Sequence, residues 1–226
     1  MMLRFWIYDS LPQENFIKMI TQKPAQNNTA RKTAIILLAA GKSTRFAGSN
    51  KLSQELSGIP MLTHCYNNIK HSNVAQIVVV SSQENLKQVE TLSNPYPKIG
   101  FVENNELGMG HSISIGMSCI RKEISSIIIC LADMPLVTNT HIQLLLDANK
   151  SSSFKQIHRL YDVNNLLGHP ILFNSYFFLK LKRLNGDKGA YNIIIDNKDL
   201  INIIKVNNLS VSTDIDTNDD WNNLIL

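Results

Sequence analysis

The chain has 226 residues, of which 44% are hydrophobic and 18% are charged, with a formal net charge of +4 and a pI near 8.9. This length and apolar content suffice for a sizeable hydrophobic core, most economically in one domain. The Lys and Arg residues are scattered, which suits anionic small molecules and gives little support to nucleic-acid binding. No apolar run reaches the roughly eighteen residues needed to span a bilayer. We therefore expect neither nucleic acid nor a membrane as a partner.

Residues 1–32 differ in composition from the rest of the chain. An apolar stretch rich in aromatic residues leads into the polar linker QKPAQNNTARK, and Asp9 and Glu14 interrupt any apolar segment typical of a secretory signal. We expect residues 1–32 to be an extension and linker, either an added strand or helix on the flank or a contact with a partner. Residues 33–226 are expected to form a single domain.

The cysteines and histidines do not have the spacing of metal sites. Cys65, Cys119 and Cys130 are odd in number and lack CxxC spacing, which predicts reduced thiols in a cytoplasmic protein. The histidines show neither HxxxH nor HExxH spacing, so a transition-metal site is not expected.

Apolar strands alternate with helical patterns along most of the chain. Ile35 to Leu38 has the length and branching of a strand buried on both faces, which is typical of parallel sheets. Further strands are predicted at 75–80, 99–103, 127–132, 156–162, 170–173 and 201–206, and helices at 61–70, 84–92 and 111–124. This alternation predicts an α/β fold, a three-layer α/β/α sandwich with a mostly parallel, Rossmann-like sheet.

The first predicted strand runs into a loop with a glycine, hydroxyl groups and cations, AIILLAAGKSTRFAGSNK from Ala34 to Lys51. Its GKS resembles the end of a P-loop, but the first glycine of that motif would fall on Ile36, inside the strand. The pattern instead predicts a longer loop around a triphosphate, with Arg45 on two phosphate oxygens and Lys51 at the reacting phosphorus. The alternative is an ordinary turn with solvated basic residues.

Two acidic turns are candidate sites for a divalent cation. Asp133 directly follows a predicted strand, where its carboxylate could hold the Mg²⁺ that nucleotide chemistry generally needs. The alternative is that Asp133 caps a helix beginning near Leu136. In the segment DIDTNDD, alternation places Asp214 and Asp216 on one face, so the spacing does not choose between them. That segment could also be a polar turn before a final helix.

Three glycine-containing segments are further candidates. ELGMGHSISIG places two glycines and Ser112 ahead of a predicted helix, a suitable place for an anion or a base. Gly168-His169-Pro170 and GDKGA from Gly186 are small-residue turns with polar side chains. On their own, the histidine would more often be a satisfied structural residue and Lys188 a solvated charge.

These segments, taken in order, resemble the motifs of the MobA-like nucleotidyltransferases. The chain matches LAAGxSxRxGxxK, LADxPxx and DIDTPxD, and GMxxS, GHPxxF and GDxGAR lie between the first and the last of these. The Ala-Ala-Gly turn is most similar to the corresponding turn in the branch of the family that contains molybdenum cofactor cytidylyltransferase. The chain departs from the family pattern by one extra residue before Gly48, by Asn218 in place of Pro and by Tyr191 in place of Arg.

The resemblance implies roles for individual residues. Lys51, Arg45 and Asp133 would be catalytic, and Asp133 with Asp216 would hold Mg²⁺. The nucleotide-binding residues would be Leu38, Ala39, Ala40, Gly41, Ser43, Arg45, Lys51, Gly108 and Ser112. The acceptor would lie against Gly168, His169, Pro170, Gly186, Asp187, Lys188 and Gly189.

The implied reaction is transfer of CMP from CTP to the phosphate of molybdopterin-type molybdenum cofactor, with release of pyrophosphate. CTP is favoured over GTP because the guanylyl branch usually has glycine in place of Ala40. A transient contact with a molybdoenzyme is also expected.

Two alternatives remain open. Guanylyl transfer, or another small phosphorylated acceptor, would use the same loop and metal. A chaperone that binds nucleotide or cofactor for molybdoenzymes, without catalysis, would explain the departures from the family pattern.

Overall fold

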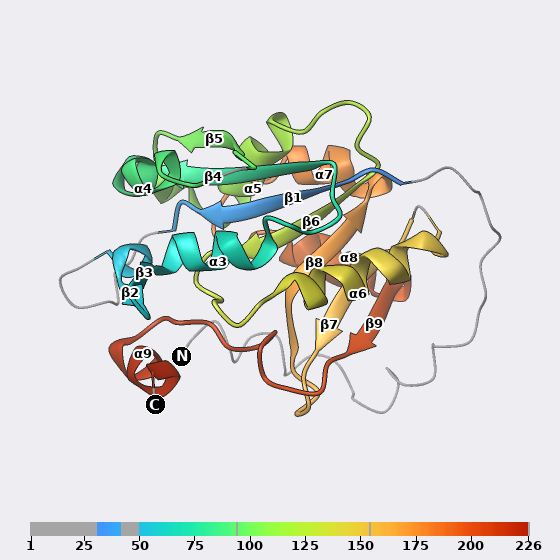
Figure 1. The fold of residues 1–226 in the computed structure, drawn as a ribbon. Helices are drawn as coiled ribbons and strands as arrows, with labels where there is room; N and C mark the ends of the chain where they lie inside the picture. Colours follow the sequence, from blue (N-terminus) through green and yellow to red (C-terminus); the bar gives the residue numbers. More distant parts are fainter. Residues whose placement is uncertain (1–30, 42–49, 94, 154, 226) are drawn as a thin grey trace.

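The computed structural model describes residues 31–41, 50–93, 95–153 and 155–225. A seven-stranded sheet forms its centre, in the order β5-β4-β1-β6-β8-β7-β9 (Figure 1). The pairs that include β8 are antiparallel and the other neighbouring pairs are parallel, which confirms the prediction of a mostly parallel sheet. The strands of this sheet are β1 (Thr33–Ala39), β4 (Gln76–Ser82), β5 (Lys98–Val102), β6 (Ser126–Leu131), β7 (Ile157–Tyr161), β8 (Leu167–Asn174) and β9 (Ile201–Lys205).

Helices cover both faces of this sheet. On one face lie α3 (Met61–Ile69), α4 (Leu86–Glu90), α6 (Asn139–Lys150) and α9 (Asn218–Ile225). On the other face lie α5 (Gly108–Ser118), α7 (Phe178–Lys182) and α8 (Tyr191–Asp196). Short 3₁₀ turns and a two-stranded ribbon complete the described structure: η2 (Lys51–Ser53), η3 (Gln83–Asn85), η4 (Asn105–Leu107), η5 (Ser175–Phe177), η6 (Lys198–Leu200), β2 (Glu55–Leu56) and β3 (Ile59–Pro60).

Strand β1 divides its side chains between two hydrophobic clusters. Ile35 and Leu37 pack with α3, α4 and α6, whereas Ile36 and Leu38 pack with α5, α7 and α8. The four side chains are at most 9% exposed. Because successive residues of a strand point to opposite faces, a continuous apolar run can serve both clusters. The predicted three-layer α/β/α sandwich is confirmed.

Some boundaries differ from those expected. The glycines of the GMG segment do not precede α5 but form its first turn, since the helix begins at Gly108. The φ of Gly108 is +84°, a conformation that favours glycine. Strand β8 begins at Leu167 and so includes Pro170, which lacks an N–H. The register of β7 shifts between Arg159 and Tyr161, opposite this proline, and so accommodates it within the sheet.

Helix α6 was not among the helices expected from the sequence. It begins at Asn139 after Thr138, whose N–H donates to His141 Nδ1 at 3.0 Å. The other ring nitrogen of His141 lies 2.8 Å from Ser210 Oγ. The cap of α6 is therefore Thr138, and the alternative in which Asp133 caps a helix near Leu136 is wrong.

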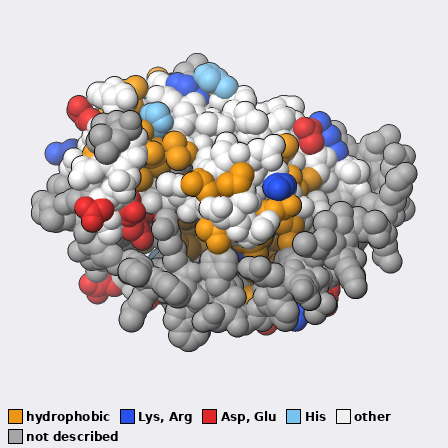
Figure 2. Space-filling view, turned by 90° about the horizontal axis from the view of Figure 1, so that it is seen from below, with side chains coloured by type: hydrophobic (Ala, Val, Ile, Leu, Met, Phe, Trp, Pro, Cys, Tyr) orange, Lys and Arg blue, Asp and Glu red, His pale blue; other side chains and the backbone are white. Residues whose placement is uncertain are grey.

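The surface seen in Figure 2 is mixed in character. Hydrophobic side chains gather near the middle of this face, and Lys, Arg, Asp and Glu side chains are dispersed among and around them. Within the described ranges, no helix combines the length and apolar character needed to cross a bilayer.

A buried polar network joins the ends of several elements at the edge of the sheet where β1 begins. Arg31 donates to Asn149 Oδ1 at 2.8 Å, and Asn149 Nδ2 donates to Ser126 Oγ at 3.0 Å. His158 is fully buried, with Nε2 3.0 Å from Ser152 Oγ and Nδ1 3.0 Å from Asn202 Nδ2. Burial, with a smaller contribution from the charge of Arg31, lowers the pKa of His158 from 6.5 to about 4.

This pKa predicts an acid-sensitive fold. Between about pH 6.5 and pH 4 the unfolded chain binds a proton at His158 that the folded chain does not, so the free energy of unfolding falls as the pH is lowered. For this residue the loss between pH 7 and pH 5 is about 2 kcal/mol. We expect His158→Gln to reduce the pH dependence by about that amount in urea denaturation at the two pH values. An unchanged dependence would contradict this assignment.

Candidate functional site

Three residues predicted for catalysis or metal binding meet at the carboxyl end of β6. Lys51 Nζ lies 2.9 Å from Asp133 Oδ2 and 3.1 Å from Asp216 Oδ1. Lys51 begins η2, Asp133 follows β6, and Asp216 precedes α9, so the three are remote in sequence. Of the two acidic residues that the sequence left open, Asp216 is the one whose carboxylate accepts from Lys51.

The Lys51 side chain is largely buried and lies between two carboxylates. It is 11% exposed, against 25% for Asp133 and 33% for Asp216. Burial by itself would lower the pKa of Lys51, but the two carboxylates, Asp133 above all, outweigh it and raise that pKa. Lys51 is thus a fixed positive charge at neutral pH.

Lys51 bonds to one oxygen of Asp133, Oδ2, and the other oxygen is Oδ1. Asp133 Oδ1 is buried, and no donor among the described residues reaches it. A buried carboxylate oxygen without a donor is costly unless a ligand satisfies it. Mg²⁺ is usually held by one or two carboxylates together with water and phosphate oxygens, so Asp133 and Asp216 fit a divalent cation.

The segment that carries Asp216 is fastened to the sheet by the backbone. Ile215 N–H donates to Asp133 O at 3.0 Å, and the Ile215 side chain is fully buried in the cluster of α3, α4 and α6. Further back, His169 N–H donates to Val211 O at 2.9 Å. These bonds keep Asp216 beside Asp133.

Side chains reinforce this arrangement at two further points. Asp162, which is fully buried, accepts from Ser212 Oγ at 2.5 Å and from two N–H groups in the turn between β7 and β8. Asp220 Oδ2 accepts from the N–H of Asp216 at 3.1 Å and from that of Thr217 at 2.9 Å. Asp162 had not been singled out in the sequence, since its partners lie in another segment.

The predicted nucleotide loop is described at its two ends. Leu38, Ala39 and Ala40 are buried at the end of β1, whereas Gly41 is exposed. Ser43, Arg45 and the extra residue before Gly48 lie outside the described residues. Ala40 is 2% exposed and belongs to the cluster of α5, α7 and α8.

Two asparagines that sequence reasoning missed join the ends of this loop. Asn85 Nδ2 donates to Ala39 O at 2.8 Å, and Asn50 Nδ2 donates to Asn85 Oδ1 at 2.6 Å. The only signal in the sequence is an asparagine three residues after the Ser-Ser end of a predicted strand.

The glycine turn of α5 and the GDKG segment are brought together. Gly110 N–H donates to Gly186 O at 2.7 Å, and Gly186 N–H donates to Leu107 O at 3.0 Å. A Cβ on Gly108 would lie 2.3 Å from Asp187 Oδ1, so glycine is required there by contact as well as by φ. Ser112 is buried, and its hydroxyl donates to Gly108 O at 3.4 Å.

The remaining residues predicted to bind the acceptor lie in the GDKG segment and in β8. Lys188 and Gly189 belong to the GDKG segment, and a Cβ on Gly189 would lie 2.7 Å from Met109 Sδ. Gly168, His169 and Pro170 lie in β8. Burial first, and the charge of Arg159 second, lower the pKa of His169 to about 4, so its ring is neutral at pH 7. Its Nδ1 is buried and has no hydrogen-bond partner among the described residues.

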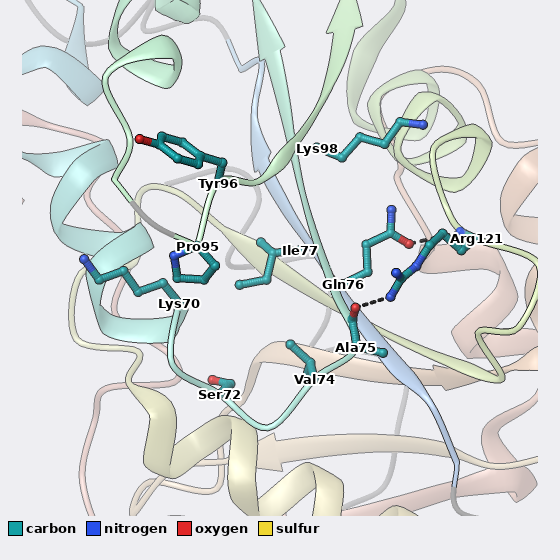
Figure 3. Close-up of a pocket in the computed structure, with 10 residues that line it drawn as sticks. All are labelled: Lys70, Ser72, Val74, Ala75, Gln76, Ile77, Pro95, Tyr96, Lys98 and Arg121. Carbon is teal, nitrogen blue, oxygen red and sulfur yellow. Dashed lines mark hydrogen bonds between the residues drawn. The ribbon is translucent and has the colours of Figure 1, made fainter.

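A pocket of about 340 Å³ lies at the opposite end of the sheet, beside the first residues of β4 and the segment before β5. Figure 3 shows Lys70 and Lys98 on opposite sides of this pocket, with their ammonium groups directed away from Ile77. Arg121 pairs with Glu123 at 3.2 Å. No residue predicted for the site lines this pocket, and its cations do not converge.

Comparison with known proteins agrees with this geometry. A family model described as the MobA-like NTP transferase domain matches residues 35–200. The chain belongs to this family. Membership makes it a nucleotidyltransferase with a nucleotide-binding, Rossmann-like domain.

Curated relatives of the MobA-like domain differ in how much of their length the chain matches. The purine catabolism protein PucB of Bacillus subtilis strain 168 is 31% identical over 174 residues, covering 70% of this chain and 78% of PucB. The bifunctional protein GlmU of Staphylococcus epidermidis is 31% identical over 119 residues, covering 52% of this chain. The chain spans 26% of the length of that GlmU.

Solved structures share the fold. Rv0371c of Mycobacterium tuberculosis H37Rv superposes with a TM-score of 0.77 at 23% identity, covering 87% of this chain and 98% of that one. A structure of Rv0371C in complex with manganese has a TM-score of 0.72 at 20% identity, covering 86% and 98%.

The contact between β8 and the Asp216 segment allows no side chain at residue 168. A Cβ on Gly168 would lie 1.6 Å from Val211 O. We expect Gly168→Ala to push this segment away and to lower the free energy of unfolding by about 1–3 kcal/mol in urea denaturation. Gly41→Ala is the control, because a Cβ there would meet no described atom within 4 Å. Equal stabilities of the two variants would contradict the prediction.

Proposed function

We propose that this MobA-like protein transfers CMP from CTP to the phosphate of a molybdopterin-type molybdenum cofactor, releasing pyrophosphate. The observation that carries the proposal is the convergence of Lys51 with Asp133 and Asp216 at the carboxyl end of the sheet. In open α/β sheets, ligands bind at this end, so the three charged groups lie where a triphosphate is expected. The motifs that surround them favour the molybdenum cofactor branch.

In this proposal Asp133 and Asp216 hold Mg²⁺. The unpartnered Asp133 Oδ1 supports it, as does the manganese complex of the structurally similar mycobacterial protein, although that likeness concerns the fold. When bound, the ion would neutralise charge on the α-phosphate. The chain's own contribution is to hold side by side two carboxylates that are remote from each other in the sequence.

The acceptor needs no general base. A phosphate monoester has a second pKa near 6 and is largely ionised at neutral pH, so it can attack the α-phosphorus directly. The protein's task is then alignment and charge stabilisation. Lys51, charged at neutral pH, would stabilise the negative charge that develops on the departing pyrophosphate, and Arg45 would hold the phosphates.

The choice of base and acceptor rests on residues around this centre. The presence of Ala40 favours CTP by resemblance, because the guanylyl branch usually has glycine at this position. Gly108 and Ser112 would lie against the nucleotide. Gly168, His169 and Pro170, with Gly186, Asp187, Lys188 and Gly189, would form the acceptor side. The product could then pass to a molybdoenzyme during a transient contact.

The decisive experiment measures pyrophosphate release with CTP, GTP, ATP or UTP, with and without molybdopterin-bound molybdenum and in the presence of Mg²⁺. We expect release with CTP and the acceptor together. Release with GTP or with another phosphorylated acceptor would replace the proposal with that activity. Nucleotide binding without release under any condition would support a chaperone without catalysis.

The metal assignment predicts the effect of one substitution. Asp133→Asn removes one negative charge from the centre and should lower kcat/KM for the productive nucleotide about 100-fold or more. Asp147→Asn is the control, since Asp147 pairs with Lys150 on the outside of α6. Intact turnover in Asp133→Asn would refute the assignment.

A further inference from the structure

Asn85 stands between the two ends of the predicted nucleotide loop. It lies at the end of η3, after β4, and is 1% exposed. Its Nδ2 donates to the carbonyl of Ala39, the last residue of β1, and its Oδ1 accepts from Asn50 Nδ2. One side-chain amide thus joins the residue where the chain leaves the sheet to the residue where it returns.

Asn50 carries this connection to Lys51. Its Oδ1 accepts from Leu52 N–H at 3.0 Å and its carbonyl accepts from Ser53 N–H at 3.0 Å, so Asn50 caps the η2 turn that Lys51 begins. A second bond, from Asn50 Nδ2 to Glu84 O at 3.4 Å, ties the same cap to η3. The position of the Lys51 backbone therefore depends on Asn50, which Asn85 holds.

The connection uses both functions of the amide. Neither aspartate nor leucine would reproduce it, because aspartate cannot donate to Ala39 O and leucine can neither donate nor accept. Removing the side chain would leave the Ala39 carbonyl and the Asn50 amide without this partner. The loss of these hydrogen bonds by largely buried groups costs free energy.

We propose that Asn85 is a positioning residue that fixes both ends of the nucleotide loop and, through Asn50, presents Lys51 to the phosphates. This role rests on the proposed function for its effect on catalysis. Asn85 fixes the positions of the loop ends before nucleotide binds. Loss of its side chain therefore weakens nucleotide binding more than it slows turnover. Lys51 keeps its two carboxylate partners, which preserves the charge at the reacting centre.

The test compares Asn85→Ala with Asn174→Ala. Asn174 is equally buried, and its amide also donates to two carbonyl groups, those of Ser153 and Gln156, so it controls for the loss of a buried asparagine. For Asn85→Ala we expect KM for the productive nucleotide to rise about tenfold and kcat to fall less than threefold. For Asn174→Ala we expect an unchanged KM.

A second variant tests the coupling between the two asparagines. Asn50→Asp keeps an oxygen for Leu52 N–H but loses the donor to Asn85 Oδ1 and the longer bond to Glu84 O. If the two asparagines act as one unit, the rise in KM of the double variant Asn50→Asp/Asn85→Ala should be smaller than the product of the two single effects. Additive effects would overturn the proposal.

Hydrogen exchange tests the inference independently of the reaction. In the nucleotide-free protein, the amides of Leu52 and Ser53 should exchange faster in Asn85→Ala than in wild type or Asn174→Ala. Unchanged exchange would overturn the positioning role whatever the activity. Faster exchange in a protein that releases no pyrophosphate would uphold the positioning of the loop ends and overturn the proposed function instead.

Discussion

The site depends on one buried ammonium group shared by two carboxylates. Lys51 brings together the start of η2, the end of β6 and the segment before α9, none of which is adjacent in sequence. Without the lysine, Asp133 and Asp216 would face each other with like charges in a partly dry environment. Without either carboxylate, a largely buried cation would lose part of its compensation. The three groups are therefore mutually dependent.

Such an arrangement needs a rigid frame, and the central sheet provides it. Strands β1 and β6 are direct neighbours, in register from Thr33 with Ser126 to Leu38 with Leu131. Ala132 N–H continues this pairing by donating to Leu38 O at 3.0 Å. The loop after β1 and the acidic turn after β6 consequently start side by side. The third part of the centre is attached to this frame by backbone hydrogen bonds to Asp133 and to β8.

The sequence predicted the central strands and the acidic turn after β6 better than the hydrogen bonds that join other segments to them. The apolar run at Ile35 to Leu38 and the acidic turn at Asp133 carry local signals, because a strand buried on both faces needs uninterrupted apolar residues. Helix α6 lacked such a signal: the cap at Thr138 uses a histidine where Glu or Gln is usual, so the pattern of a capping box was hidden. Asn85 and Asp162 could not be found from spacing, since their partners lie in segments that only the fold brings close. The GMG glycines were placed outside α5 because glycine disfavours helices, whereas contact with the GDKG segment requires them there.

The direction of β8 has a consequence for how the centre is assembled. Because β8 runs opposite to β6, its first residues, including Gly168, reach the same edge of the sheet as the last residues of β6. The ends of β1 and β6 thus position Lys51 and Asp133, whereas the segment that carries Asp216 is attached where the hairpin of β7 and β8 returns. Asp162 bonds both to the turn of this hairpin and to Ser212. A change in that turn would therefore reach the centre through the Asp216 segment, without altering the pairing of β1 with β6.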